Sequence, residues 1–192
     1  MSAKGKHGKS ATGLLLIARA ADFAARAHVT QKRKGAAQEP YINHLAEVAL
    51  LLTEATDGAD ADLIAASWLH DTLEDTETER EELEARFGSA VAAIVAEVTD
   101  DKALPKAERK RLQVETAPSK SAKARMLKIA DKTSNLRALA MSPPVGWDLE
   151  RRHEYINWAE AVVAGCRGLN ERLEGVFDDA VRHARAAIGS TE

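Results

Sequence analysis

The densest group of residues able to do chemistry is the segment Ser67–Asp75, which carries an imidazole and three carboxylates. His70 and Glu74 are four residues apart. The same spacing separates Asp71 from Asp75, so in a helix the members of each pair share a face. Three acids at the end of an apolar helix repel one another unless a cation neutralises them. The segment therefore indicates a metal site or, as the alternative, a solvated acidic helix end.

Two other positions carry side chains of the types that bind metals. His44 begins a predicted helix and, taken alone, is typical of a surface or capping histidine. Asp131 lies in a strongly apolar helical pattern, with Asn135 four residues later, which predicts a central helix. A buried aspartate needs a partner. That partner is either a metal ion or, through a salt bridge, Lys128 or Lys132.

The elements that position these residues are predicted to be helices, because apolar residues recur at helical spacing and nowhere alternate as in a strand. We expect an all-α, single-domain bundle over residues 11–192, preceded by a disordered basic tail at residues 1–10. The expected helices cover about residues 14–30, 43–55, 60–75, 90–99, 122–140, 148–166 and 170–188. A short acidic helix follows the predicted capping box Thr76–Glu79, Ser89 caps the next helix, and Pro105 opens another.

The bulk composition limits the possible partners and compartments. The 192 residues fit one domain, and the net charge of -3 provides no global attraction to nucleic acid or to a membrane surface. No stretch is long enough to span a bilayer. Cys166 is the only cysteine, which excludes an intramolecular disulfide and a thiolate zinc cluster. A reducing cytoplasm is therefore the predicted location.

The order of the motifs resembles the hydrolase half of RelA/SpoT proteins, and most closely the small stand-alone alarmone hydrolases of the metazoan SpoT-homologue type. The resemblance runs from about Ala21 to the final helix. It is carried by Tyr41–His44, Leu69–Asp75, Val98–Lys102, Ala107–Glu115, Ala130–Lys132, Asn135–Arg137 and Gly146–Trp147.

The resemblance implies a helical HD-domain fold with a divalent metal ion. Its implied ligands are His44, His70, Asp71 and Asp131. Two imidazoles and two carboxylates suit Mn²⁺ better than a closed structural zinc site, and Zn²⁺ remains possible on ligands alone. Glu74 and Asp75 match the family's pair that orients and deprotonates the attacking water in metal-assisted hydrolysis.

The implied substrate is guanosine tetraphosphate or pentaphosphate, from which the enzyme removes the 3′-pyrophosphate to leave GDP or GTP. Such an anion needs local basic groups in a chain of net charge -3. The matching positions are Arg33, Lys34, Asn135, Lys102, Lys106, Arg151 and Tyr155. Arg33 is expected to stack on the base and Lys34 to pair with phosphate. An ordinary solvated surface is the alternative for Lys32–Lys34 and the favoured interpretation for Arg109–Arg111.

Two other functions remain open at this point. The same fold could hydrolyse another phosphorylated nucleotide, such as the adenosine counterpart ppApp or NADPH. It could also be a non-catalytic module that binds a nucleotide as a sensor or antitoxin, against which the repulsive pair Glu74–Asp75 argues. No segment for alarmone synthesis fits in the remaining residues, so we expect degradation only. The sequence does not determine the oligomeric state.

Overall fold

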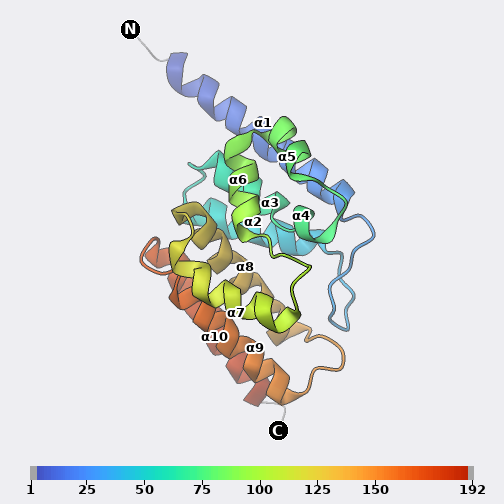
Figure 1. Cartoon of the computed structure of the whole chain (residues 1–192). Helices are drawn as coiled ribbons and strands as arrows, with labels where there is room; N and C mark the ends of the chain where they lie inside the picture. The colour runs from blue at the N-terminus through green and yellow to red at the C-terminus, as the bar shows by residue number, and fades with distance from the viewer. Residues whose placement is uncertain (1–3, 190–192) are drawn as a thin grey trace.

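A computed structural model describes residues 4–189, and the side chains of residues 12–189, as a bundle of helices (Figure 1). The helices are α1 (Lys4–Ala27), α2 (Ile42–Ala55), α3 (Ala61–Leu69), α4 (Thr72–Asp75), α5 (Arg80–Phe87), α6 (Ser89–Val98), α7 (Lys106–Thr116), the 3₁₀ helix η1 (Ala117–Ser119), α8 (Ala122–Met141), α9 (Leu149–Ala164) and α10 (Glu171–Gly189). Residues 4–189 contain no strand, only two isolated β-bridges. The predicted all-α fold is therefore confirmed. None of the described helices is long and apolar enough to cross a membrane.

Helix α8 lies at the centre of the bundle, as the apolar pattern around Asp131 predicts. It packs against α2, α6, α9 and α10 (Figure 1). Helix α3 packs against α1, α2 and α6. Leu127, Ile129 and Leu136 of α8 are buried in one continuous hydrophobic cluster that draws on nearly all these helices. This packing brings the N-terminal part of α2 and the end of α3 against the middle of α8.

Helix α1 begins earlier than the sequence predicts. It starts at Lys4, so residues 4–10 are helical where a disordered tail is expected, and residues 1–3 lie outside the described part of the chain. The basic residues of this segment do not interrupt the helix that the apolar run from Leu14 continues. The division into a tail and a domain remains a prediction.

The single helix predicted from about residue 60 to residue 75 is wrong, because the helix breaks between Leu69 and Thr72. Two side chains cause the break. His70 Nδ1 donates to the carbonyl of Ser67 at 2.8 Å, and Thr72 Oγ1 donates to the carbonyl of Leu69 at 2.6 Å. In a continuous helix these carbonyls would accept from backbone N–H groups four residues later. Local side-chain bonds thus compete with the helical ladder.

The two predicted helix caps are also wrong. Helix α5 begins at Arg80 without a side-chain cap, and Thr76 Oγ1 instead donates to the carbonyl of Thr72 at 2.7 Å. Ser89 is the first residue of α6 and makes no capping bond. It follows Gly88, whose φ of 88° ends α5, since glycine adopts this conformation without steric cost.

The basic loop before α2 is packed against the loop that follows α8. The amide of Val145 donates to the carbonyl of Lys34 at 3.1 Å, and Gly35 forms a β-bridge with Pro144. A Cβ atom at Gly35 would collide with the carbonyl and hydroxyl of Ser142. Glycine is therefore needed for this close approach, which fixes the place of the loop that carries the predicted substrate contacts.

Candidate active site

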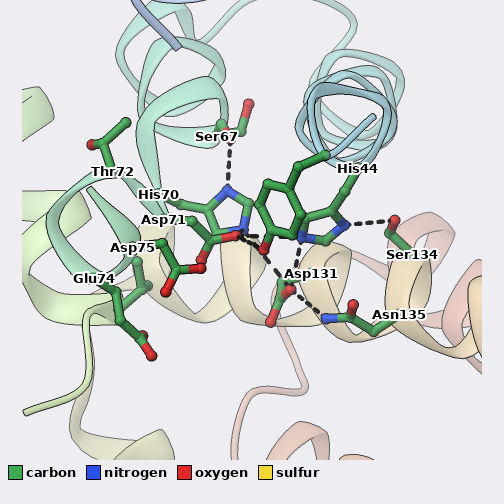
Figure 2. A network of polar contacts seen from close by, with 12 residues as sticks. His44, Ser67, His70, Asp71, Thr72, Glu74, Asp75, Asp131, Ser134 and Asn135 are labelled. Carbon is green, nitrogen blue, oxygen red and sulfur yellow. Dashed lines mark hydrogen bonds and ion pairs between the residues drawn. The ribbon is translucent and has the colours of Figure 1, made fainter. Parts of the chain in front are cut away.

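The four side chains that were predicted as metal ligands converge where α2, the α3–α4 break and α8 meet (Figure 2). His44 Nε2 lies 3.3 Å from Asp131 Oδ1 and 3.6 Å from Asp71 Oδ2. His70 Nε2 lies 3.1 Å from Asp71 Oδ2 and 3.8 Å from Asp131 Oδ1. Two imidazole nitrogens and two carboxylates therefore share one small volume. We call these four residues the His–Asp cluster.

Hydrogen bonds on the far side of each ring define which imidazole nitrogen faces the cluster. His70 Nδ1 donates to the carbonyl of Ser67, which can only accept. Ser134 Oγ donates to Glu47 Oε2 at 2.6 Å, so it accepts from His44 Nδ1 at 2.9 Å. When the rings are neutral, both Nε2 atoms are left with a lone pair directed into the cluster, which is the tautomer that binds a metal.

The residues present fit a divalent metal ion. One ligand atom from each of His44, His70 and Asp131 lies within 4.8 Å of the others. His70 Nε2 is buried and makes no hydrogen bond of good geometry within the described residues, although Asp71 Oδ2 lies 3.1 Å away. A buried nitrogen without a well-formed hydrogen bond costs free energy unless something binds it. Two imidazoles with two carboxylates form a mixed nitrogen and oxygen donor set that accepts Mn²⁺ or Zn²⁺.

The electrostatics of the His–Asp cluster favour a bound positive charge. Burial opposes a charge on His70, but the carboxylates of Asp71 and Asp131 outweigh it and raise the pKa of His70 to about 10. Burial lowers the pKa of His44. Burial would raise the pKa of Asp131, yet the Lys132 ammonium and both imidazoles hold it well below its usual range. Either a proton or a metal ion can supply the charge that these carboxylates attract.

Glu74 and Asp75 lie beside the His–Asp cluster and not within it (Figure 2). Asp75 is firmly paired, since it accepts from Lys102 Nζ at 2.7 Å and from Gln31 Nε2 at 3.1 Å. Glu74 has only longer contacts, at 3.4 Å. Burial, together with the Asp100 carboxylate, raises the pKa of Glu74. Of the two acids, Glu74 is the one whose oxygens are less committed to hydrogen bonds.

A cavity of about 650 Å³ opens next to these acids, a size typical of small-molecule sites. A smaller cavity of about 180 Å³ adjoins it and reaches the His–Asp cluster, since Tyr41, Glu74 and Asp75 line both. Six of the seven predicted substrate contacts line the larger cavity: Arg33, Lys34, Lys106, Asn135, Arg151 and Tyr155. The seventh, Lys102, is not in that lining and instead pairs with Asp75.

The predicted contacts also contact one another. Arg33 donates to Asn135 Oδ1 at 2.9 Å, so the basic loop is linked to α8. The guanidinium carbon of Arg151 lies 4.6 Å from the ring centroid of Trp147. Burial raises the pKa of Tyr155 to about 12, so its phenol stays protonated and can donate to an anion. Cations and donors therefore line the cavity on more than one side.

Sequence reasoning gave no role in the active site to three residues beside the cluster, although it offered two of them, Lys128 and Lys132, as salt-bridge partners of Asp131. Lys132 Nζ pairs with Asp131 Oδ2 at 2.9 Å and lies 4.5 Å from the ring centroid of Trp158. The salt bridge that was the alternative to a metal site is thus present beside the imidazole contacts. Lys128 bonds to the carbonyl of Val98 at 2.9 Å. Tyr41 donates its hydroxyl to Asp71 Oδ2 at 2.6 Å.

Apart from Lys106, the face of α7 that lines the larger cavity was missed as well. It presents Lys106, Arg109, Lys110 and Gln113. Their spacing of three and four residues places them on one face of a helix, and this pattern could have separated them from Arg111. The interpretation of Arg109–Arg111 as ordinary surface therefore holds for Arg111 alone, which pairs with Glu108 and Glu115 of the same helix.

Comparison with known proteins agrees with this geometry. Residues 20–156 match the protein family described as HD domain. The guanosine-3′,5′-bis(diphosphate) 3′-pyrophosphohydrolase MESH1 of Xenopus tropicalis is 52% identical over 163 residues, which are 85% of this chain and 91% of that protein. The Homo sapiens protein of the same name is 49% identical over 172 residues, which are 90% and 94% of the two chains.

A solved structure is also similar over most of the chain. It is reported as a metazoan ortholog of SpoT that hydrolyzes ppGpp and plays a role in starvation responses. The two chains share 42% identity with a TM-score of 0.84 over 87% of this chain and 94% of the other. The resemblance noted from the sequence motifs is thereby confirmed. The chain belongs to the HD-domain family and, within it, to the family of the MESH1 guanosine-3′,5′-bis(diphosphate) 3′-pyrophosphohydrolases.

Proposed function

We propose that the chain is a metal-dependent guanosine-3′,5′-bis(diphosphate) 3′-pyrophosphohydrolase. The observation that carries this proposal is the His–Asp cluster, which opens beside Glu74 and Asp75 onto a cavity lined with basic side chains. Water and ppGpp would give GDP and pyrophosphate, and pppGpp would give GTP and pyrophosphate. The names of the relatives that cover most of the chain support the same reaction.

The metal ligands in this proposal are His44, His70, Asp71 and Asp131. A divalent ion held by them would supply Lewis-acid chemistry. We expect Mn²⁺, because a mixed nitrogen and oxygen donor set with room for water is more typical of Mn²⁺ than of a closed structural zinc site. The single cysteine of the chain, Cys166, is buried and free. We therefore propose a reducing cytoplasm as the compartment.

The proton-transfer steps fall to the acids beside the cluster. Glu74 takes the proton of the attacking water, because its carboxylate has only long contacts and a raised pKa. Asp75, which Lys102 holds at 2.7 Å, orients that water. The negative charge of the leaving pyrophosphate is met by Lys106 and Arg151 on the walls of the cavity.

The nucleoside part of the substrate is assigned to the part of the cavity lined by the basic loop before α2 and by α8. Arg33 and Asn135, which are joined by a 2.9 Å hydrogen bond, would contact the base and the ribose. Lys34 and Tyr155 line the same cavity and would donate to phosphate oxygens. Lys102 would act on the substrate only by leaving Asp75, since it does not line the cavity in this arrangement.

The deciding experiment is incubation of the purified full chain with ppGpp, ppApp and NADPH, each with and without Mn²⁺, followed by identification of the products. Pyrophosphate released from ppGpp only when Mn²⁺ is present supports the proposal. Orthophosphate from NADPH alone would make the chain a phosphatase. Binding of ppGpp without any turnover would make it a non-catalytic nucleotide-binding module.

A variant of Glu74 tests its assigned role. Glu74→Gln keeps the shape of the side chain but cannot accept a proton, so kcat should fall by about 10²–10⁴-fold while Mn²⁺ affinity is retained. The matched control is Glu77→Gln, an exposed acid of the same segment, which should retain wild-type turnover. Equal turnover in Glu74→Gln and the wild type would reject Glu74 as the base.

A further inference from the structure

Helix α7 lies along the active-site cavity without contributing a buried residue to the core. Its cavity face consists of polar side chains, among them Arg109 and Gln113, which are one helical turn apart. Hydrophobic burial therefore does not explain where this face of α7 lies. Besides the packing of α7 against α9, polar contacts with residues around the active site hold this face in place.

These contacts lead to both oxygens of Glu74. Arg109 Nη1 lies 3.4 Å from Glu74 Oε1. The amide of Asp100 lies 3.4 Å from Glu74 Oε2. Asp100 is in turn held from α7, because Gln113 Nε2 donates to its Oδ2 at 2.6 Å. Arg109 thus reaches one oxygen of the carboxylate directly, and Gln113 reaches the other through Asp100.

The Arg109–Glu74 pair is well placed to act on orientation. Both side chains are 23% exposed, so solvent screens the pair less than it screens a surface pair. Within residues 12–189, Glu74 is the only carboxylate at ion-pair distance from Arg109. At 3.4 Å the contact is longer than the usual 2.9 Å hydrogen bond. It can therefore orient the Glu74 carboxylate and still leave its oxygens free to accept a proton. Lys102, in contrast, holds Asp75 in a close ion pair of 2.7 Å.

We propose that Arg109 is a positioning residue that holds the carboxylate of Glu74 at the edge of the His–Asp cluster, with Gln113 steadying the opposite oxygen through Asp100. This inference rests on the proposed function, in which Glu74 accepts the proton of the attacking water. Arg109 acts through Glu74 and takes no proton itself. Its loss should therefore lower the rate of the chemical step and leave binding of the nucleotide largely unchanged.

Arg111 provides a matched control on the same helix. It carries the same charge two residues further on, but its side chain is 52% exposed. It pairs with Glu108 and Glu115 of α7 and does not line the cavity. Substitution of Arg111 removes an equal charge from the same helix without touching Glu74.

The test compares Arg109→Met with Arg111→Met in the full chain, with Mn²⁺ and ppGpp. Arg109→Met should lower kcat by about 100-fold, the scale of a misplaced catalytic group, with KM within about threefold of wild type. Arg109→Lys should recover part of that loss, as should guanidinium ion added to Arg109→Ala. Arg111→Met should keep kcat within about twofold. The Mn²⁺-induced rise in melting temperature should be the same in every variant.

A double variant separates positioning from a general structural role. If Arg109 acts only through Glu74, Arg109→Met should cause no further loss of kcat in a Glu74→Gln background. A full further loss there would overturn the inference. So would a loss of kcat no larger than that of Arg111→Met, or a loss confined to KM. If the wild type released no pyrophosphate, the proposed function itself would be overturned. This outcome is visible before any variant is compared, so it is distinguishable from a failure of the inference about Arg109.

Discussion

Ser134→Ala should weaken metal binding although Ser134 is not a predicted ligand. The hydroxyl of Ser134 is buried between His44 Nδ1, at 2.9 Å, and Glu47 Oε2, at 2.6 Å. It accepts from the imidazole and donates to the carboxylate, so it fixes both the tautomer and the orientation of the His44 ring. Removal of the oxygen atom leaves His44 Nδ1 buried without an acceptor. The ring is then free to rotate or to change its tautomer.

The size of the effect follows from what remains around the site. Glu47 keeps its ion pair with Arg137 at 2.9 Å, so the carboxylate is not left unpaired. The imidazole loses its only acceptor on that side, and an unsatisfied buried group costs about 1–3 kcal/mol. Loss of such an orienting partner lowers metal affinity by about 10–100-fold. At about 1.4 kcal/mol per tenfold change, the two estimates agree.

The assay is calorimetric titration of Mn²⁺ into metal-free protein. Ser67→Ala is the matched control, because Ser67 is also buried beside a histidine that we propose as a ligand, His70. Its hydroxyl donates to the carbonyl of Ile64 at 2.6 Å, whereas His70 uses the backbone carbonyl of Ser67, which alanine retains. Ser67→Ala should bind Mn²⁺ within about twofold of wild type. Equal affinities in Ser134→Ala and Ser67→Ala would refute the reasoning about tautomers.

Two further predictions concern the cluster and the lysine behind it. His70→Ala should abolish Mn²⁺ binding and turnover together, and full turnover without detectable Mn²⁺ binding would contradict the ligand assignment. Burial, together with the Lys132 ammonium, lowers the pKa of Lys128 from 10.5 to about 8. Between these pH values the unfolded chain binds more protons than the folded protein, so the folded protein gains stability as the pH rises. Below pH 8 the charged Lys128 destabilises the folded protein to the full extent. Lys128→Met should therefore stabilise the metal-free protein at pH 7 by up to about 3 kcal/mol, less about 1 kcal/mol for the lost bond to the Val98 carbonyl. Urea unfolding of both proteins should show this advantage shrinking towards pH 10.5, and a pH-independent difference would count against it.

The helices and the convergence of the His–Asp cluster were predictable because they depend on regular patterns. Apolar residues at helical spacing predict that α8 is central, and this places Asp131 inside the bundle. The order of motifs then assigns His44 and His70 to the same site. The basic face of α7 was open to the same reasoning, since Arg109 and Gln113 are four residues apart. Apart from Lys106, this face was missed because the adjacent Arg111, a basic residue outside the pattern, obscured the helical spacing.

The break between α3 and α4 was not predictable, because it depends on competition between bonds of similar strength. Periodicity places His70 and Glu74 on one face of a continuous helix. The bonds from His70 Nδ1 and Thr72 Oγ1 to backbone carbonyls interrupt that helix, so Asp71 joins the cluster and Glu74 lies beside it. Asp71 and Glu74, three residues apart, thereby reach separate positions, as the proposed mechanism requires of a residue on the ion and another on the water. Because these bonds lie within the protein, the ring of His70 is oriented before an ion arrives, and metal binding need not supply the free energy to order it.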